Sequence, residues 1–158
     1  NDVELIFSLE QTPPTMPQEW EECNRASQRY GLSLSPLEMH ALGEARVKAL
    51  ENTGRVEFGG GILKKLILAF CDSPYITQNS YAGILAQLQE IFYYFKNESL
   101  ERLTDEELLG AMRRFFNGPA HGSLEMLARS SLEELCRGLR GGRPEKKEGE
   151  QEDEDDEW

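Results

Sequence analysis

Apolar side chains recur every three or four residues in the middle of the chain, which is the spacing of one face of an α-helix. The positions are Tyr81, Ile84, Leu85, Leu88, Ile91, Phe92 and Phe95. Each such side chain contributes about 1.5–3 kcal/mol when fully buried, before conformational entropy is subtracted. The pattern therefore predicts a long central helix that organises the core.

Capping signals predict two further helices. Ser35 and Glu38 flank a proline in a capping box, and Gly54 closes the helix that they open. Thr104 and Glu107 form a second capping box, before a helix that ends near residue 117. The first of these helices is expected to bury one apolar stripe, formed by Leu37, Ala41, Ala45 and Leu50.

Weaker signals complete a helical chain. Proline and glycine positions predict helices over residues 17–31 and residues 62–71. Ser123 and Ser131 are expected to cap two short final helices. The predicted fold is therefore mainly α, a compact bundle of about six or seven helices.

A short glycine-rich segment, residues 54–61, departs from the helical period. Val56 and Phe58 alternate there with polar neighbours, as side chains do along a strand. This segment could pair with residues 3–8 as a small two-stranded ribbon.

Charge divides the chain into two parts. The 158 residues carry a formal net charge of -12, and residues 141–158 hold nine acidic residues against three basic ones. Such a tail has too little apolar surface to offset its ordering entropy, so we predict one helical domain over residues 1–140 and a disordered acidic tail over residues 141–158. A chain without a basic face is not expected to bind nucleic acid or an anionic membrane.

Cysteine usage and hydropathy indicate a soluble, cytoplasmic chain. Cys23, Cys71 and Cys136 are far apart and lack the paired spacing of a zinc site or a disulfide framework. No apolar run is long enough to span a bilayer. We therefore expect reduced thiols, no metal and no other cofactor.

Four polar residues flank the helix predicted over residues 62–71 and are candidates for a ligand-binding pocket. They are Arg55, Glu57, Asp72 and Tyr75. A ten-residue helix is about 15 Å long, so the two pairs could converge only with the help of another element. The alternative is structural, with Asp72 capping a turn and Tyr75 packing.

Other reactive residues fit structural roles better than catalytic ones. Cys71 continues an apolar helix face, which favours a buried thiol over a nucleophile served by His121. His40 and Glu44 lie four residues apart, as in an ordinary surface pair, and two ligands do not make a metal site. The glycines at residues 59–61 precede a helix but lack the spacing of a phosphate-binding loop.

Tyr93 and Tyr94 extend aromatic character beyond the stripe of the central helix. One of the two must face away from the main seam, because neighbouring residues on a helix point in different directions. The pair is therefore a candidate interaction surface. A second buried face on the same helix is the alternative.

Three phrases of the sequence resemble a known family. They are GRVEFG at residues 54–59, FCDSPY at residues 70–75 and IFYYFKNE at residues 91–98. In this order they resemble an uncharacterised family of clostridial-type bacterial proteins, known as a domain of unknown function, over about residues 3–140. The resemblance implies a bacterial cytosolic origin and supplies no activity, cofactor or catalytic residue.

The absence of a catalytic constellation favours a binding role over an enzymatic one. The leading hypothesis is a helical interaction or scaffold module whose partner is another protein. The alternative is a small-molecule-binding or hydrolytic domain that uses a pocket near Arg55, Glu57, Asp72 and Tyr75.

Overall fold

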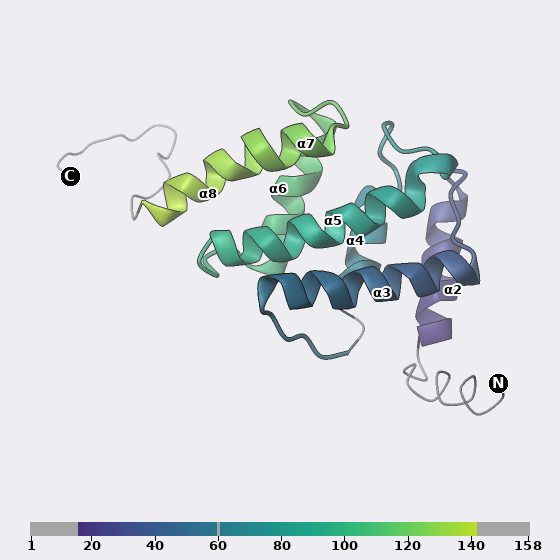
Figure 1. The fold of residues 1–158 in the computed structure, drawn as a ribbon. Helices are drawn as coiled ribbons and strands as arrows, with labels where there is room; N and C mark the ends of the chain where they lie inside the picture. The colour runs from purple at the N-terminus through teal and green to yellow at the C-terminus, as the bar shows by residue number, and fades with distance from the viewer. Residues whose placement is uncertain (1–15, 60, 142–158) are drawn as a thin grey trace. The chain divides into compact units, whose positions relative to one another are not determined.

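The computed structural model describes residues 16–59 and 61–141, and within these ranges all regular structure is helical (Figure 1). In chain order the elements are α2 (Met16–Gln28), α3 (Pro36–Thr53), α4 (Leu63–Phe70), α5 (Gln78–Glu98), α6 (Asp105–Asn117), α7 (Leu124–Met126), the π-helical turn η1 (Leu127–Leu132) and α8 (Glu133–Arg140). The mainly α fold predicted from the sequence is confirmed.

The chain divides into two compact units, residues 1–93 and residues 94–158. Helix α5 begins in the first unit and ends in the second. The single domain predicted over residues 1–140 stays a prediction. Residues 3–8 and almost all of the predicted acidic tail lie outside the described residues.

The two predicted capping boxes are both formed. The Ser35 hydroxyl accepts a hydrogen bond from the Glu38 backbone N–H at 3.1 Å, and the Glu38 carboxylate accepts one from the Ser35 N–H at 2.9 Å. Thr104 and Glu107 make the same two bonds before α6, at 3.0 and 2.9 Å. Gly54 ends α3 with a φ of 69°, in the left-handed region that glycine adopts without strain.

The core of the first unit is built on α4 and on α5 up to residue 93. All five apolar positions predicted for the helix after the glycine run are buried: Ile62, Leu63, Leu66, Ile67 and Phe70. On α5, Tyr81, Leu85, Leu88 and Phe92 are buried as predicted. Helix α2 packs on α4, and a salt bridge of 2.9 Å between Glu22 and Lys64 joins the two helices.

The stripe predicted for α3 is wrong. Leu37 is 79% exposed, and Ala41 is also exposed. The buried face instead carries Leu42 and Ala49, which lie seven residues apart. Polar contacts favour this orientation, because the Gln89 side chain on α5 donates a hydrogen bond to the carbonyl of Leu42 at 3.1 Å.

The second unit contains α6 and a helical run from α7 through η1 to α8. Helix α6 packs on η1, and it buries the four predicted apolar residues Leu108, Leu109, Met112 and Phe116. Ser123 caps α7 as predicted. Ser131 is no cap, because it lies inside η1, where the helical backbone continues without a break.

The described half of the predicted ribbon does not form a strand. Residues 55–58 follow α3 as irregular backbone, and Val56 and Phe58 are exposed. The alternation seen in the sequence is real, but its direction is inverted. Glu57 turns inward and its apolar neighbours turn outward.

Candidate functional site

One carboxylate fixes the loop of residues 55–58, which leaves the end of α3 in Figure 1. Glu57 Oε1 accepts hydrogen bonds from Arg46 Nε, at 3.2 Å, and from the Tyr93 hydroxyl. Arg46 Nη2 also donates to the backbone carbonyl of Glu57 at 3.3 Å. Arg46 belongs to α3 and Tyr93 to α5, so Glu57 ties the loop to two helices of the first unit. We call Arg46, Glu57 and Tyr93 the brace.

The brace is largely shielded from water. The side chains of Arg46 and Glu57 are 19% and 24% exposed, and Tyr93 is 1% exposed. Burial, followed by the hydrogen bond to the Glu57 carboxylate, raises the pKa of Tyr93. The hydroxyl therefore stays a donor at neutral pH. Hydrogen bonds to an ionised acceptor in such a setting are stronger than those on the open surface.

Gly61 leaves room for the brace. Its φ is +79°, and a Cβ atom at this position would overlap Arg46 Nε and lie 2.8 Å from Glu57 Oε1. Any side chain here would have to displace the ion pair. The glycine that closes the loop is thus required by both the backbone conformation and the space that Arg46 and Glu57 occupy.

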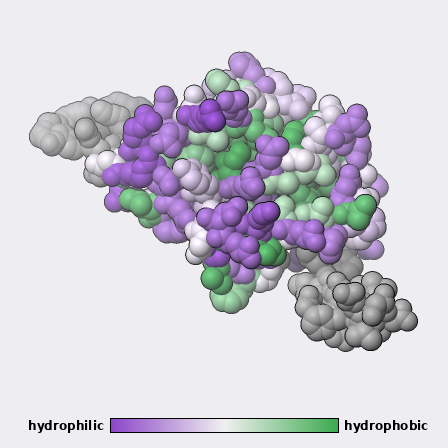
Figure 2. Space-filling view, viewed as in Figure 1, coloured by the Kyte–Doolittle hydropathy of each residue, from purple (hydrophilic) through white to green (hydrophobic). Residues whose placement is uncertain are grey.

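The two apolar residues beside Glu57 point into solvent. Val56 is 79% exposed, and Phe58, at 89%, is the most exposed large hydrophobic side chain among the described residues. In the space-filling view, hydrophobic residues reach the surface in small groups set among hydrophilic ones (Figure 2). Phe58 and Val56 together place two exposed apolar side chains on a loop that the brace holds in place.

Of the four residues predicted to line a pocket, Glu57 is a member of the brace. Its carboxylate accepts hydrogen bonds from Arg46 and Tyr93. Arg55 is half-buried, whereas Asp72 and Tyr75 are exposed. The Tyr75 backbone N–H donates to the Ser73 hydroxyl at 3.3 Å, which shapes the turn after α4. A pocket formed by the four residues stays a prediction.

The predicted aromatic pair is split by the helix. Tyr93 lies in the core and in the brace, so it offers no surface to a partner. Tyr94 is 49% exposed and packs edge-to-face on Phe95 with ring centroids 4.9 Å apart. The reasoning that one of the two must face away is correct for Tyr94.

A sequence model of one protein family matches residues 19–145. The chain belongs to DUF6323, a family of unknown function. The resemblance found in the sequence is thereby confirmed at the level of the family, while its clostridial origin stays a prediction. No curated protein and no solved structure matches this DUF6323 chain.

The three cysteines of the DUF6323 chain are buried, and none of them forms a disulfide. Burial raises the pKa of Cys23 and of Cys136 to about 11, which keeps both thiols protonated at neutral pH. In the described ranges, no three His, Cys, Asp or Glu residues are grouped so that they could hold a metal ion. No helix in the described part of the chain is both long and apolar enough to cross a bilayer.

Two further sequence candidates also have structural contacts in the DUF6323 chain. His40 and Glu44 form an exposed pair, with His40 Nε2 and Glu44 Oε2 3.3 Å apart. Lys64, beside the glycine turn, bonds Glu22 at 2.9 Å. The glycine turn itself includes residue 60, which lies outside the described residues.

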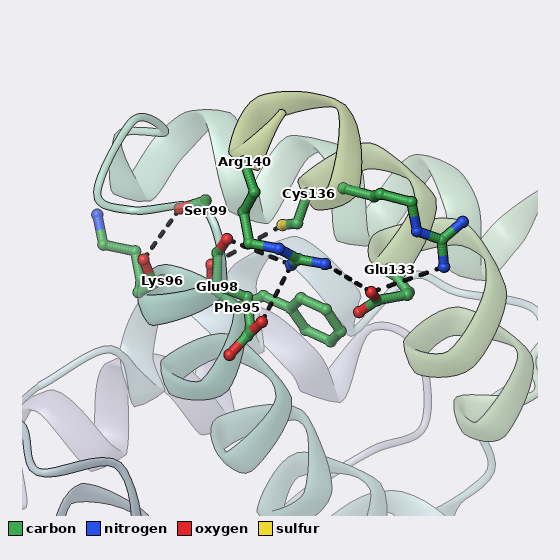
Figure 3. A network of polar contacts seen from close by, with 8 residues as sticks. Phe95, Lys96, Glu98, Ser99, Glu133, Cys136 and Arg140 are labelled. Carbon is green, nitrogen blue, oxygen red and sulfur yellow. Dashed lines mark hydrogen bonds and ion pairs between the residues drawn. The ribbon is translucent and has the colours of Figure 1, made fainter. Parts of the chain in front are cut away.

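The second unit contains a polar network of its own (Figure 3). Arg140 lies between two carboxylates, 3.0 Å from Glu98 at the end of α5 and 2.8 Å from Glu133 at the start of α8. The hydrogen bond to Glu133 raises the pKa of Arg140. The Cys136 thiol contacts the carbonyl of Phe95 at 4.0 Å. These contacts hold α8 against the end of α5, and sequence periodicity gave no sign of them.

Sequence reasoning missed Arg46, considered Gly61 only as part of a glycine turn, and assigned Glu57 and Tyr93 to two separate candidate sites. The signal that could have joined them is the isolated acid between two apolar residues in a glycine-rich turn. An acid that turns inward at that position needs a partner, because burying an unpaired charge is costly. Arg46 was not distinguishable by sequence from the other basic residues of a surface helix.

Proposed function

We propose that this DUF6323 chain is a helical protein-interaction module that contacts its partner through Val56 and Phe58. The observation that carries the proposal is the contrast within three residues. Glu57 is fixed from inside by Arg46 and Tyr93, while the side chains on either side of it are 79% and 89% exposed. The exposed side chains of Val56 and Phe58 contribute little to the stability of the free chain, whereas a partner could cover both.

The two side chains could contribute substantially to a binding energy. Burying a valine or phenylalanine side chain contributes about 1.5–3 kcal/mol, so the pair could supply about 3–6 kcal/mol. Because about 1.4 kcal/mol is a tenfold change in affinity, this amounts to roughly two to four orders of magnitude. Aromatic anchors near the centre of an interface commonly supply much of its binding energy.

The test is affinity capture from an extract of the source organism, followed by mass spectrometry. The tagged chain is compared with Phe58→Ser and with a matched control, Leu37→Ser. Leu37 is as exposed as Val56 but lies on the first turn of α3, away from the loop. We expect one set of proteins to be retained by the parent chain and by Leu37→Ser, and to be lost with Phe58→Ser.

The proposal is wrong if Phe58→Ser retains the same proteins at the same yield. A Tyr94→Ser variant runs in parallel, because Tyr94 is exposed and is part of the interaction surface suggested by the sequence. Loss of the partner with Tyr94→Ser and not with Phe58→Ser would move the interaction surface to the end of α5. Circular dichroism and a thermal melt of each variant establish that the fold is retained.

A further inference from the structure

We infer that Arg46 and Tyr93 are positioning residues that fix the Val56–Phe58 contact element in its binding conformation before any partner arrives. The inference rests on the proposed function and goes beyond it. It assigns a role in recognition to two side chains that a partner at the loop would not touch. Arg46 is 19% exposed and Tyr93 1%.

The first support is the convergence of independent groups on one carboxylate. Arg46 reaches Glu57 from α3, and Tyr93 reaches it from α5. Arg46 also bonds the Glu57 carbonyl, so that both the side chain and the backbone of the central loop residue are held. Three hydrogen bonds on one residue restrict the backbone on either side of it.

The second support is that the helices supplying the brace are themselves fixed. Leu42 and Ala49, on either side of Arg46 along α3, are buried. Phe92, next to Tyr93 on α5, is buried and stacks edge-to-face on the tyrosine ring at 5.5 Å. Groups on packed helices hold a loop more firmly than groups on another loop.

The third support is that the brace is not needed merely to reverse the direction of the chain between α3 and α4. A loop of this length between two helices can be closed with glycines and exposed polar residues. Here a salt bridge and a tyrosine hydroxyl hold the loop, and Gly61 leaves space for them. Such an arrangement lowers the ordering cost that a flexible loop would incur on binding.

The predicted consequence is that loss of the brace frees the loop without unfolding the unit. Limited proteolysis with chymotrypsin measures this directly, since Phe58 is itself a cleavage site and Gly59 follows it. Cleavage requires the backbone to open locally, so its rate reports the population of the open loop. No partner has to be known for this measurement.

The variants are Arg46→Gln and Tyr93→Phe, which leave the residues around the cleaved bond unchanged. The matched control is Lys48→Gln, which removes an exposed positive charge from the same helix. We expect cleavage after Phe58, identified by mass spectrometry, to become at least tenfold faster in Arg46→Gln. For Tyr93→Phe we expect about threefold, and for Lys48→Gln no change. Arg46→Lys, which keeps the charge but not the forked geometry, should restore part of the protection.

A merely structural role would accelerate cleavage at many sites in parallel. The positioning role predicts a selective increase after Phe58 with little change in cleavage elsewhere. The inference is overturned if cleavage after Phe58 is no faster in Arg46→Gln than in Lys48→Gln. It is equally overturned if all sites accelerate together.

Binding supplies a second readout that separates this inference from the proposed function. If Phe58→Ser loses a protein that the parent chain retains, Tyr93→Phe and Arg46→Gln should lower the recovery of that protein several-fold. Full recovery with both variants would overturn the positioning role and leave the proposed function standing. If Phe58→Ser loses nothing, the proposed function fails, while the proteolysis still decides whether the brace orders the loop.

Discussion

Replacing Gly61 with alanine should break the brace without mutating any of its three residues. Gly61 has a φ of +79°, and the added Cβ would overlap the Arg46 guanidinium. Gly59 provides the matched control, because its φ is +77° while nothing lies within 4 Å of a Cβ built there. Both substitutions share the backbone strain, and Gly61→Ala alone disturbs the ion pair.

The expected magnitudes follow from these two contributions. An alanine in the left-handed region costs about 1–2 kcal/mol, of which about 0.4–1 kcal/mol is offset because alanine restricts the unfolded chain more than glycine does. Gly59→Ala should therefore lower the free energy of unfolding by about 1 kcal/mol. Losing a hydrogen bond to a charged group costs about 1.5–3 kcal/mol more, so Gly61→Ala should lose about 2–4 kcal/mol.

Urea unfolding followed by circular dichroism measures both free energies under identical conditions. The informative quantity is the difference between the two variants, since the shared strain cancels. Equal losses in Gly59→Ala and Gly61→Ala would refute the reasoning, because the ion pair would then have moved aside at no cost. A third measurement, Gly61→Ala in an Arg46→Gln background, should show the difference shrinking, as expected for residues in direct contact.

Four further outcomes can be checked on the same protein. Leu88→Ala should cost about 2–5 kcal/mol in denaturant unfolding, because it leaves a cavity in the core that α5 organises; a loss below about 1 kcal/mol would contradict this role. Thr104→Ala should cost about 0.5–2 kcal/mol by removing the capping bond to the first turn of α6, whereas an unchanged thermal midpoint would mean that the cap is not needed. Leu100 has a φ of 57°, so Leu100→Asn should stabilise the chain by about 0.5–1.5 kcal/mol in a thermal melt, and a destabilisation would show that its exposed side chain packs after all. Burial raises the pKa of Cys23 and Cys136 from 9.0 to about 11. Because the thiols of the unfolded chain lose their protons first as the pH rises, the free energy of unfolding should fall between pH 9 and 11. This fall should be smaller in a Cys23→Ala, Cys136→Ala double variant.

The helices could be predicted where the sequence carries a local rule. The capping boxes at Ser35 and Thr104 satisfy backbone groups within the same turn, so four residues suffice to recognise them. The stripe of α5 could be read because its apolar residues are large and their spacing is unambiguous. The buried face of α3 could not be predicted, because its apolar residues are small or spread around the helix. The orientation of α3 also depends on Gln89 and Arg46.

The candidate site shows the same limit. Val56, Glu57 and Phe58 are visible in the sequence as an alternation, but the alternation does not say which side faces the protein. That direction depends on Arg46, eleven residues earlier, and on Tyr93, thirty-six residues later. Apolar residues normally face the protein interior. Here the hydrogen bonds from Arg46 and Tyr93 turn Glu57 inward in their place.

Helix α5 affects how the protein can be divided for experiment. The boundary between the two units falls after Tyr93, yet the helix continues to Glu98. A fragment that stops at the boundary would place Tyr93 at a frayed chain end, where the hydrogen bonds of the last helical turn are missing. The tyrosine that holds the Val56–Phe58 loop would then lose its support. Fragments of the first unit should therefore retain α5 through its natural end, and isolated pieces cut at Tyr93 should be expected to lose the ordered loop together with the second unit.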